Sequence, residues 1–217
     1  MRLADYGRRP PRRFPLSTKA STATERPAAL GQSDRIAASR YWLFALPAIL
    51  GFAIDLATKA WVFSIPTLRN GDINWLWTGH VGIELSRNWG ALFGIGQGMV
   101  WLFAALGVVA ALAIPCWLFV FGAARDGWLT FALGCIMAGV LGNLYDRLGL
   151  SGEDWAGPGR HAPQAIYAVR DWILWQANDR WRWPNFNVAD SLLVTGAGIL
   201  LLHAFWHSGA SSPGDGE

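Results

Sequence analysis

Long apolar stretches alternate with polar segments along this chain of 217 residues. The hydrocarbon core of a bilayer is about 30 Å thick, so a helix that crosses it needs roughly 20 mostly apolar residues. The stretches that meet this requirement are residues 42–65, 99–122, 128–145 and 188–206. The composition agrees, because 53% of the residues are hydrophobic and only 15% are charged. The pattern therefore predicts an all-α integral membrane protein with four transmembrane helices.

The polar segment over residues 66–98 contains two runs with the alternation that is typical of β-strands. They cover residues 73–77 and 81–85 and are joined by a short turn at Gly79. Alternating runs on either side of such a turn predict a hairpin. We therefore expect a small strand pair at the membrane face.

The other long polar segment covers residues 146–187 and opens with a turn-rich stretch over 149–163. Residues 165–178 follow, and there we expect a short interfacial helix. The tryptophans of this segment are Trp155, Trp172, Trp175, Trp181 and Trp183. Tryptophan is enriched where a membrane meets water, so we expect these rings to anchor the segment at the interface.

Positive charge is concentrated before the first apolar stretch. Residues 1–40 contain nine of the 18 lysines and arginines against three acidic residues. Basic segments favour the cytoplasmic side, so the N-terminus is predicted to be cytoplasmic, and four spans return the C-terminus to that side. We expect a disordered basic arm over 1–40, a four-span domain over 41–207 and a cytoplasmic tail over 208–217, with loops 66–98 and 146–187 outside.

The sequence contains no pattern that is typical of metal or cofactor binding. Its four histidines lack the two-histidine helical motif with an adjoining glutamate that zinc proteases use. The cysteines, Cys116 and Cys135, both lie inside predicted spans, where packing is their expected role. We expect no metal, no cofactor and no nucleic-acid partner.

Three aspartates lie near the outer ends of the predicted spans. Asp146 follows the third span, Asp190 lies in the first turn of the fourth, and Asp171 lies between them among apolar residues. Acidic side chains are costly near hydrocarbon and are therefore candidates for a functional site. Two carboxylates that meet are the minimum equipment for general acid–base catalysis on water.

Each of these acids also has a structural interpretation. Asp146 precedes Arg147, which favours an ion pair or a positioning role. Asp190 follows the candidate N-cap Asn187 by three residues, and acids are favoured in the first turn of a helix. For Asp171, the simple alternative is a solvated loop acid.

Asp55 and Lys59 are spaced i, i+4 in the first span, which predicts an ion pair inside that helix. An alternative is a nucleophilic pair of Lys59 with Ser64 or Ser86, although no glycine-flanked serine motif supports it.

The acids also permit functions without catalysis. A proton-coupled small transporter would use Asp55, Asp146 and Asp190 as a relay. A structural membrane scaffold is the third class, and it would leave the aspartates replaceable. Asn143 adds a constraint, because a buried amide needs hydrogen-bond partners, which carboxylates from nearby loops can supply.

Five short motifs along the chain resemble those of the lipoprotein signal peptidases (signal peptidase II), bacterial intramembrane aspartyl proteases with four spans. They are Asp-Leu-Ala-Thr-Lys at 55–59, Arg-Asn-Trp-Gly-Ala-Leu-Phe at 87–93, the block from Gly139 to Arg147, Val-Arg-Asp-Trp-Ile at 169–173 and Phe-Asn-Val-Ala-Asp-Ser at 186–191. The motifs occur in the family's order, so the resemblance covers residues 55–191.

The resemblance implies that Asp171 and Asp190 are the catalytic pair, with Asp146 in support. Further residues would line or brace the site: Asp55, Asn88, Gly139, Asn143, Arg147 and Asn187. The family fold adds a small extracytoplasmic β-cradle, in agreement with the strand pair in 66–98. The implied reaction removes the signal peptide from diacylglyceryl-modified prolipoproteins, before the lipidated cysteine and without a cofactor.

The resemblance also implies a location: the bacterial inner membrane, in contact with its lipids, with both termini cytoplasmic and the active site on the outer side. We expect a monomer. One feature departs from the family. Asp146 and Asp171 are 25 residues apart, whereas the family usually joins these motifs by a much shorter turn. The insertion over 149–168 also brings Asp154 as a rival to Asp171.

Overall fold

The computed structural model describes residues 35–90, 95–153 and 166–208. All of these except Arg35 belong to one compact unit, Ile36–Glu217. Most of the predicted basic arm, the centre of the 149–168 insertion and nearly all of the predicted tail lie outside the described residues.

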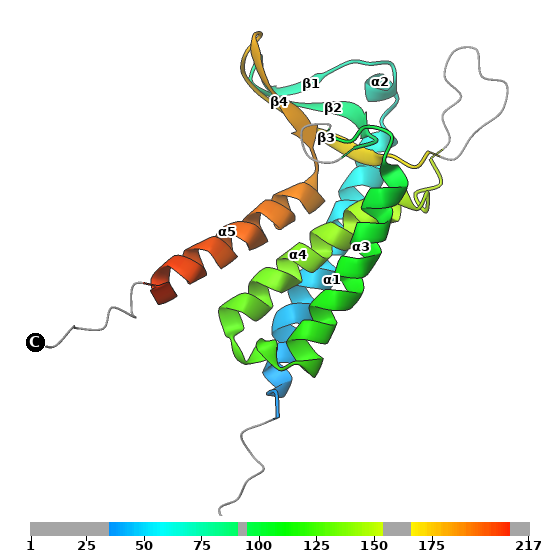
Figure 1. The fold of residues 1–217 in the computed structure, drawn as a ribbon. Helices are drawn as coiled ribbons and strands as arrows, with labels where there is room; N and C mark the ends of the chain where they lie inside the picture. Colours follow the sequence, from blue (N-terminus) through cyan, green and yellow to red (C-terminus); the bar gives the residue numbers. More distant parts are fainter. Residues whose placement is uncertain (1–34, 91–94, 154–165, 209–217) are drawn as a thin grey trace, which may run out of the picture. The chain divides into compact units, whose positions relative to one another are not determined.

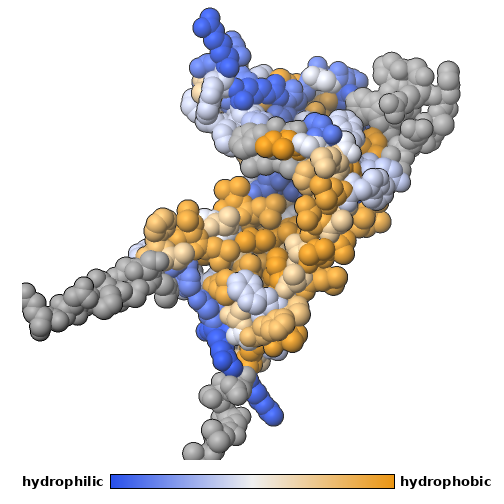
Figure 2. Space-filling model, in the orientation of Figure 1, coloured by the Kyte–Doolittle hydropathy of each residue, from blue (hydrophilic) through white to orange (hydrophobic). Residues whose placement is uncertain are grey.

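Within the described part of the chain, four helices are long and apolar enough to cross a membrane, as the sequence predicts. They are α1 Ala38–Phe63, α3 Val100–Pro115 with its π-helical continuation η2 Cys116–Val120, α4 Gly127–Arg147 and α5 Val188–Ser208. Two short elements complete the helical part, α2 Pro66–Arg69 and the 3₁₀ turn η3 Ala123–Arg125. Hydrophobic residues gather over the helices and hydrophilic residues over the sheet beyond them (Figure 2), so the helices present the apolar surface that a bilayer requires.

Helix α4 packs against each of the other three spans, while α5 leaves the group at an angle (Figure 1). In the apolar stretch of α4, 61% of the residues are buried inside the protein, against 22% for α1 and 11% each for α3 and α5. The helix begins after the N-cap Asp126, whose carboxylate accepts a hydrogen bond from the Leu129 amide at 3.1 Å. Because α4 is central, its side chains can meet residues from every other span.

The polar segments together form a four-stranded antiparallel sheet in the order β1-β2-β3-β4. The strands are β1 Asn74–Trp77, β2 Val81–Asn88, β3 Val169–Asn178 and β4 Trp181–Phe186. The first two strands confirm the hairpin predicted in residues 66–98. The β2–β3 pairing joins the segment before α3 to the segment after α4, so the sheet ties both polar segments together at one end of the helices.

The prediction of an interfacial helix over residues 165–178 is wrong, because β3 occupies most of that range. Its residues are largely apolar and aromatic, side chains that suit a pleated surface. The strand also pairs on both sides, with Ile173 opposite Ile83 of β2 and Phe186 of β4. Pairing with two neighbours outweighs the local helical pattern. The fold is therefore four apolar helices with a small antiparallel sheet.

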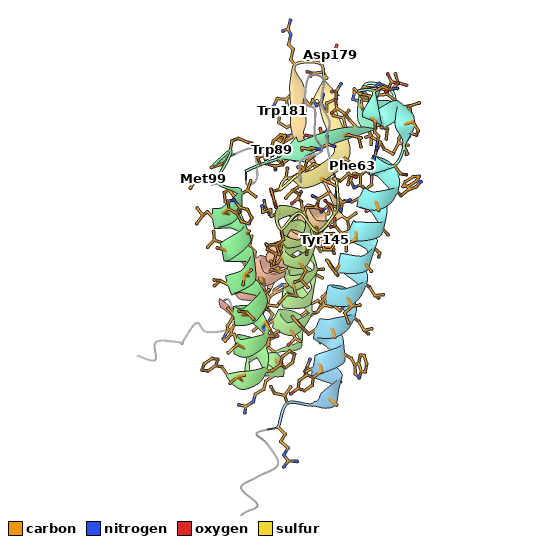
Figure 3. All side chains as sticks on the ribbon, turned by 90° about the vertical axis from the view of Figure 1, so that its right-hand side faces the viewer. Phe63, Trp89, Met99, Tyr145, Asp179 and Trp181 are labelled. Carbon is orange, nitrogen blue, oxygen red and sulfur yellow. The ribbon has the colours of Figure 1, made fainter. Side chains whose placement is uncertain are left out.

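The β3–β4 hairpin extends away from the helices. Asp179 and Trp181 lie at its far end, whereas Phe63 and Met99 lie where α1 and α3 meet the sheet (Figure 3). Three rings of the hairpin contact one another with centroids 5.6 to 6.4 Å apart: Trp175, Trp181 and Trp183. Trp155 lies outside the described residues, and membrane anchoring by these tryptophans stays a prediction.

The described ends of the insertion are tied together close to the end of α4. The Ile166 amide donates a hydrogen bond to the Glu153 carbonyl at 3.2 Å. The Tyr167 ring contacts the Trp101 ring of α3, with centroids 5.2 Å apart. The chain therefore returns near the point where it left α4, and β3 begins there despite the insertion. Asp154, the rival acid, lies outside the described residues.

Candidate active site

Asp146 holds the beginning of β3 against the last turn of α4. Its carboxylate accepts the Arg170 backbone amide at 3.1 Å, Nε at 2.9 Å and Nη2 at 2.8 Å. Both side chains are buried, so the contact fixes the chain one residue before Asp171. The sequence suggested an ion pair between Asp146 and Arg147, but Asp146 pairs with Arg170 instead. Arg147 Nη2 donates to the Gly90 carbonyl at 2.9 Å.

Strand β3 carries Asp171 into the space between the sheet and the helices. The residue lies opposite Ser86 of β2, and only 2% of it is exposed, which excludes a solvated loop acid. Its carboxylate accepts hydrogen bonds from Asn187 Nδ2 at 2.7 Å and from the Asn88 side chain. Burial and the neighbouring charge of Asp190 raise the pKa of Asp171 to about 8, so at neutral pH the group is mostly protonated.

Asp190 lies in the first turn of α5 and forms a reciprocal cap with Asn187. The Asp190 amide donates to Asn187 Oδ1 at 2.9 Å, and the Asn187 amide donates to Asp190 Oδ2 at 3.2 Å. This arrangement confirms the N-cap predicted for the fourth span. The second oxygen, Oδ1, accepts from Asn143 Nδ2 at 2.8 Å, which fixes the orientation of the carboxylate.

Two asparagines join the two carboxylates. Asn187 Nδ2 donates to Asn143 Oδ1 at 3.1 Å as well as to Asp171. Asn143 in turn donates to Asp190, so each carboxylate is bonded to one member of the linked amide pair. Both amides are buried, and each one donates and accepts hydrogen bonds, as expected of buried polar groups. The partners of Asn143 come from α1, α5 and the residue that caps α5, rather than from loops.

Lys59 lies behind the amide pair. Its Nζ contacts Asp55 Oδ2 at 2.8 Å, Asp146 Oδ2 at 3.0 Å and Asn143 Oδ1 at 3.2 Å. The i, i+4 ion pair predicted within α1 is therefore confirmed, and it extends to α4. An ammonium has three donors, and all are taken by these acceptors. The Ser64 hydroxyl donates to the Trp61 carbonyl at 2.6 Å, so the nucleophilic Ser–Lys pair has no support.

Close approach of α1 and α5 to α4 makes this network possible. Asp55 Oδ1 accepts the Ala189 backbone amide at 2.9 Å, which links α1 to the beginning of α5. A methyl group added at Gly142 would clash with the Asp55 carboxylate, and one added at Gly139 would clash with the Ala189 carbonyl. Small residues let helices approach closely, and here they bring three helices to one point.

A cavity of about 260 Å³ lies between α3, α4 and α5, with Asp190 and Arg147 in its wall. The Arg147 guanidinium carbon is 5.5 Å from the centre of the Phe103 ring. Apart from Asn143, the other wall residues, among them Leu144 and Val194, are apolar or glycine. This helix cavity therefore offers an apolar space that ends at a carboxylate and a guanidinium.

The structure brings together the residues that the sequence marks for the site: Asp55, Asn88, Gly139, Asn143, Asp146, Arg147, Asp171, Asn187 and Asp190. Arg170 belongs to the network but was missed, although its place beside Asp171 in a matching motif was the available signal. Among the described residues, no group of three or more histidine, cysteine, aspartate or glutamate side chains has the arrangement of a metal site.

Comparison with known proteins identifies the family. The family model described as "Signal peptidase (SPase) II" matches residues 47–206. The lipoprotein signal peptidase of Rhodopirellula baltica is 52% identical over 177 residues, which are 80% of this chain and 76% of that protein. The chain belongs to the signal peptidase II family. The lipoprotein signal peptidase of Pseudomonas putida is 32% identical over 193 residues, covering 85% of this chain and 96% of that protein.

Solved structures are similar to this signal peptidase II fold. A bacterial membrane enzyme determined by the in meso method at 2.3 Å resolution aligns with a TM-score of 0.63 and 21% identity, over 85% of this chain and 98% of that one. A second bacterial membrane enzyme structure, at 1.9 Å resolution, aligns with a TM-score of 0.58 and 22% identity over 79% and 95%. These likenesses support the arrangement of four helices and a sheet.

Proposed function

We propose that this signal peptidase II is an aspartic endopeptidase in which Asp171 and Asp190 activate water. The observation that carries the proposal is their shared setting: two carboxylates, each bonded to one of two linked asparagines, at the place where the sheet meets the helices. The substrate is a prolipoprotein whose cysteine carries diacylglycerol, cut just before that cysteine. The family supplies this substrate class, and the helix cavity beside Asp190 is apolar enough to suit it.

The two carboxylates differ in a way that suits two roles. Asp171 is mostly protonated at neutral pH, because its pKa is raised to about 8. Asp190 lies in the first turn of α5, accepts backbone and side-chain N–H groups, and there the helix dipole stabilises a carboxylate. In this proposal the pair shares one proton, with Asp190 as the base and Asp171 as the acid.

The reaction then needs no covalent intermediate. Asp190 takes a proton from water, whose oxygen attacks the carbonyl carbon of the scissile bond. Asp171 donates its proton to the carbonyl oxygen, which gives a neutral tetrahedral diol and leaves Asp171 ionised. As the C–N bond breaks, Asp190 gives its proton to the leaving nitrogen of the cysteine, and one diol hydroxyl returns a proton to Asp171. The products are a carboxylic acid and an amine, and the pair regains its single proton.

The membrane arrangement follows from charge and hydropathy. The basic residues of the first 40 positions favour a cytoplasmic N-terminus, and four spans bring the C-terminus to the same side. The sheet and the carboxylate pair then face the outside of the bacterial inner membrane. Asp55 and Asp146 both form ion pairs with Lys59, beside the pair of Asp171 and Asp190. These acids are therefore gathered at one point rather than staggered through the membrane, as a proton relay would require. We therefore favour the peptidase, acting as a monomer, over a proton-coupled transporter.

Asp171→Asn and Asp190→Asn test this function in cells that lack their own signal peptidase II. Each variant is expected to accumulate in the membrane while lipidated prolipoprotein remains uncut. Asp179→Asn is the matched control, since Asp179 is exposed at the far end of the β3–β4 hairpin (Figure 3). Processing at the wild-type level by either active-site variant would contradict the assignment.

A further inference from the structure

A second cavity opens on the sheet side of Asp171. Its volume is about 520 Å³, twice that of the helix cavity and within the range of pockets that hold small ligands. Hydroxyl, amide and charged side chains line it, among them Ser86, Asn88, Gln97, Asp171, Arg182 and Asn185. This sheet cavity is therefore polar where the helix cavity is apolar.

The wall of the sheet cavity is closed by contacts between strands that are not neighbours. Glu84 of β2 pairs with Arg182 of β4, although β3 lies between them. Asn185 Nδ2 donates to Glu84 Oε2 at 2.8 Å, and Arg182 Nη2 donates to Asn185 Oδ1 at 3.0 Å. These three side chains hold β4 toward β2 across one face of the sheet, and that face forms the hollow.

Each cavity is lined by one carboxylate of the pair, the first among helices and the second beside the sheet. Asp190 lines the helix cavity and Asp171 lines the sheet cavity. A peptide whose scissile bond lies between the carboxylates has an apolar space beside Asp190 and a polar space beside Asp171. The signal peptide and the acyl chains suit the first, whereas the chain that follows the cysteine leaves the membrane and suits the second.

We propose that the sheet cavity binds the first residues of the mature chain, immediately after the lipidated cysteine. Arg182 and Asn185 then determine the preference for substrates that continue past this cysteine. This inference rests on the function proposed above. Amide and hydroxyl side chains both donate and accept hydrogen bonds, so they complement the main chain of an extended peptide whatever its sequence. An extended chain advances about 3.3 Å per residue, so we expect the recognised segment to be short.

Two synthetic peptides test the proposal, each with a signal segment and a diacylglyceryl-modified cysteine. The long peptide continues for four polar residues after the cysteine, and the short peptide ends there as an amide. The purified enzyme in detergent micelles is expected to cut the long peptide with a kcat/KM at least about tenfold higher, since each hydrogen bond lost costs about two- to tenfold. Equal kcat/KM values for the two peptides would overturn the inference.

Variants locate the effect. Arg182→Ala and Asn185→Ala are expected to lower kcat/KM more for the long peptide than for the short peptide, so the length preference shrinks. Arg180→Ala is the matched control, because Arg180 is an exposed arginine near the hairpin tip outside the cavity, and it should keep the full preference. Full preference in both cavity variants would overturn the role of these residues.

The wild-type comparison remains decisive if a variant fails to fold. Failure of the wild-type enzyme to cut either peptide would contradict the proposed function itself, whereas cutting both peptides equally well would contradict only the inference about the sheet cavity.

Discussion

Replacing Lys59 by methionine tests how the site is held together. Lys59 is completely buried, and its ammonium lies 2.8 Å from Asp55 and 3.0 Å from Asp146. Methionine keeps much of the apolar stem but removes the charge. Asp146 retains Arg170 as a partner, whereas Asp55 keeps the Ala189 amide but loses its cation. The variant therefore contains a buried carboxylate whose charge is uncompensated.

The expected loss of stability is large. Removing one partner of a buried ion pair costs about 3–5 kcal/mol, because the remaining charge is no longer compensated. For a chain of this length, 1 kcal/mol shifts Tm by roughly 2–4 °C, so the melting temperature should fall by at least about 6 °C. Converting Asp55 to asparagine as well removes the stranded charge. The double variant Lys59→Met/Asp55→Asn should therefore be more stable than Lys59→Met alone.

Thermal unfolding of the purified variants in one detergent measures both effects. A coupling free energy between the two substitutions of at least about 1 kcal/mol is the expected result, as for directly contacting residues. A Lys59→Met variant within about 1 kcal/mol of wild type, or strictly additive substitutions, would refute the buried-network account.

Three further predictions concern the pair and its supports. Activity should fall as pH rises through about 8, because Asp171 then loses its proton, and a flat pH profile would contradict this. The pKa of an aspartate in the unfolded chain is about 3.9, so the stability that Asp171 contributes is complete below about pH 3.9 and is lost as pH rises toward 8. Asp171→Asn should therefore be more stable than wild type at about pH 9. Gly139→Ala should reduce stability and activity by pushing α5 from α4, whereas Gly198→Ala, where nothing lies near the added methyl, should do neither; equal unfolding curves would exclude tight packing at Gly139. Asn187→Ala should lose about 1 kcal/mol of capping free energy and at least about tenfold in kcat. The control Asn178→Ala, which removes hydrogen bonds at the hairpin tip, should leave kcat unchanged. Similar kcat values in the two variants would argue against a role for the amide pair.

Features with a local cause could be predicted from the sequence. The spans follow from the length of apolar stretches, the cap of α5 from Asn187 three residues before Asp190, and the Asp55–Lys59 ion pair from helical spacing. Each depends on residues within about one helical turn or within one continuous segment. The other site residues could be predicted from the order of the five motifs. The spacing of motifs in a family carries information about contacts that a single sequence lacks.

Features made by distant residues could not be predicted. Strand β3 has a sequence that suits an interfacial helix or a strand, and its state is decided by β2, more than 80 residues earlier in the chain. The Asp146–Arg170 contact crosses the insertion, so the motif around Asp171 marks Arg170 but not its partner. The contacts of Glu84 with Arg182 and Asn185 depend on the sheet curling across β3, which becomes visible only once the strand order is known.

The most direct test of the central claim is kcat/KM for purified Asp171→Asn, Asp190→Asn and the double variant, measured with one lipidated peptide substrate. Two carboxylates that act as a unit give strongly non-additive losses. Each single variant should therefore lose at least about a thousandfold, and the double variant should be no worse than the poorer single. A single variant within about tenfold of wild type, or losses that multiply in the double variant, would contradict the proposal that these two aspartates share the chemistry.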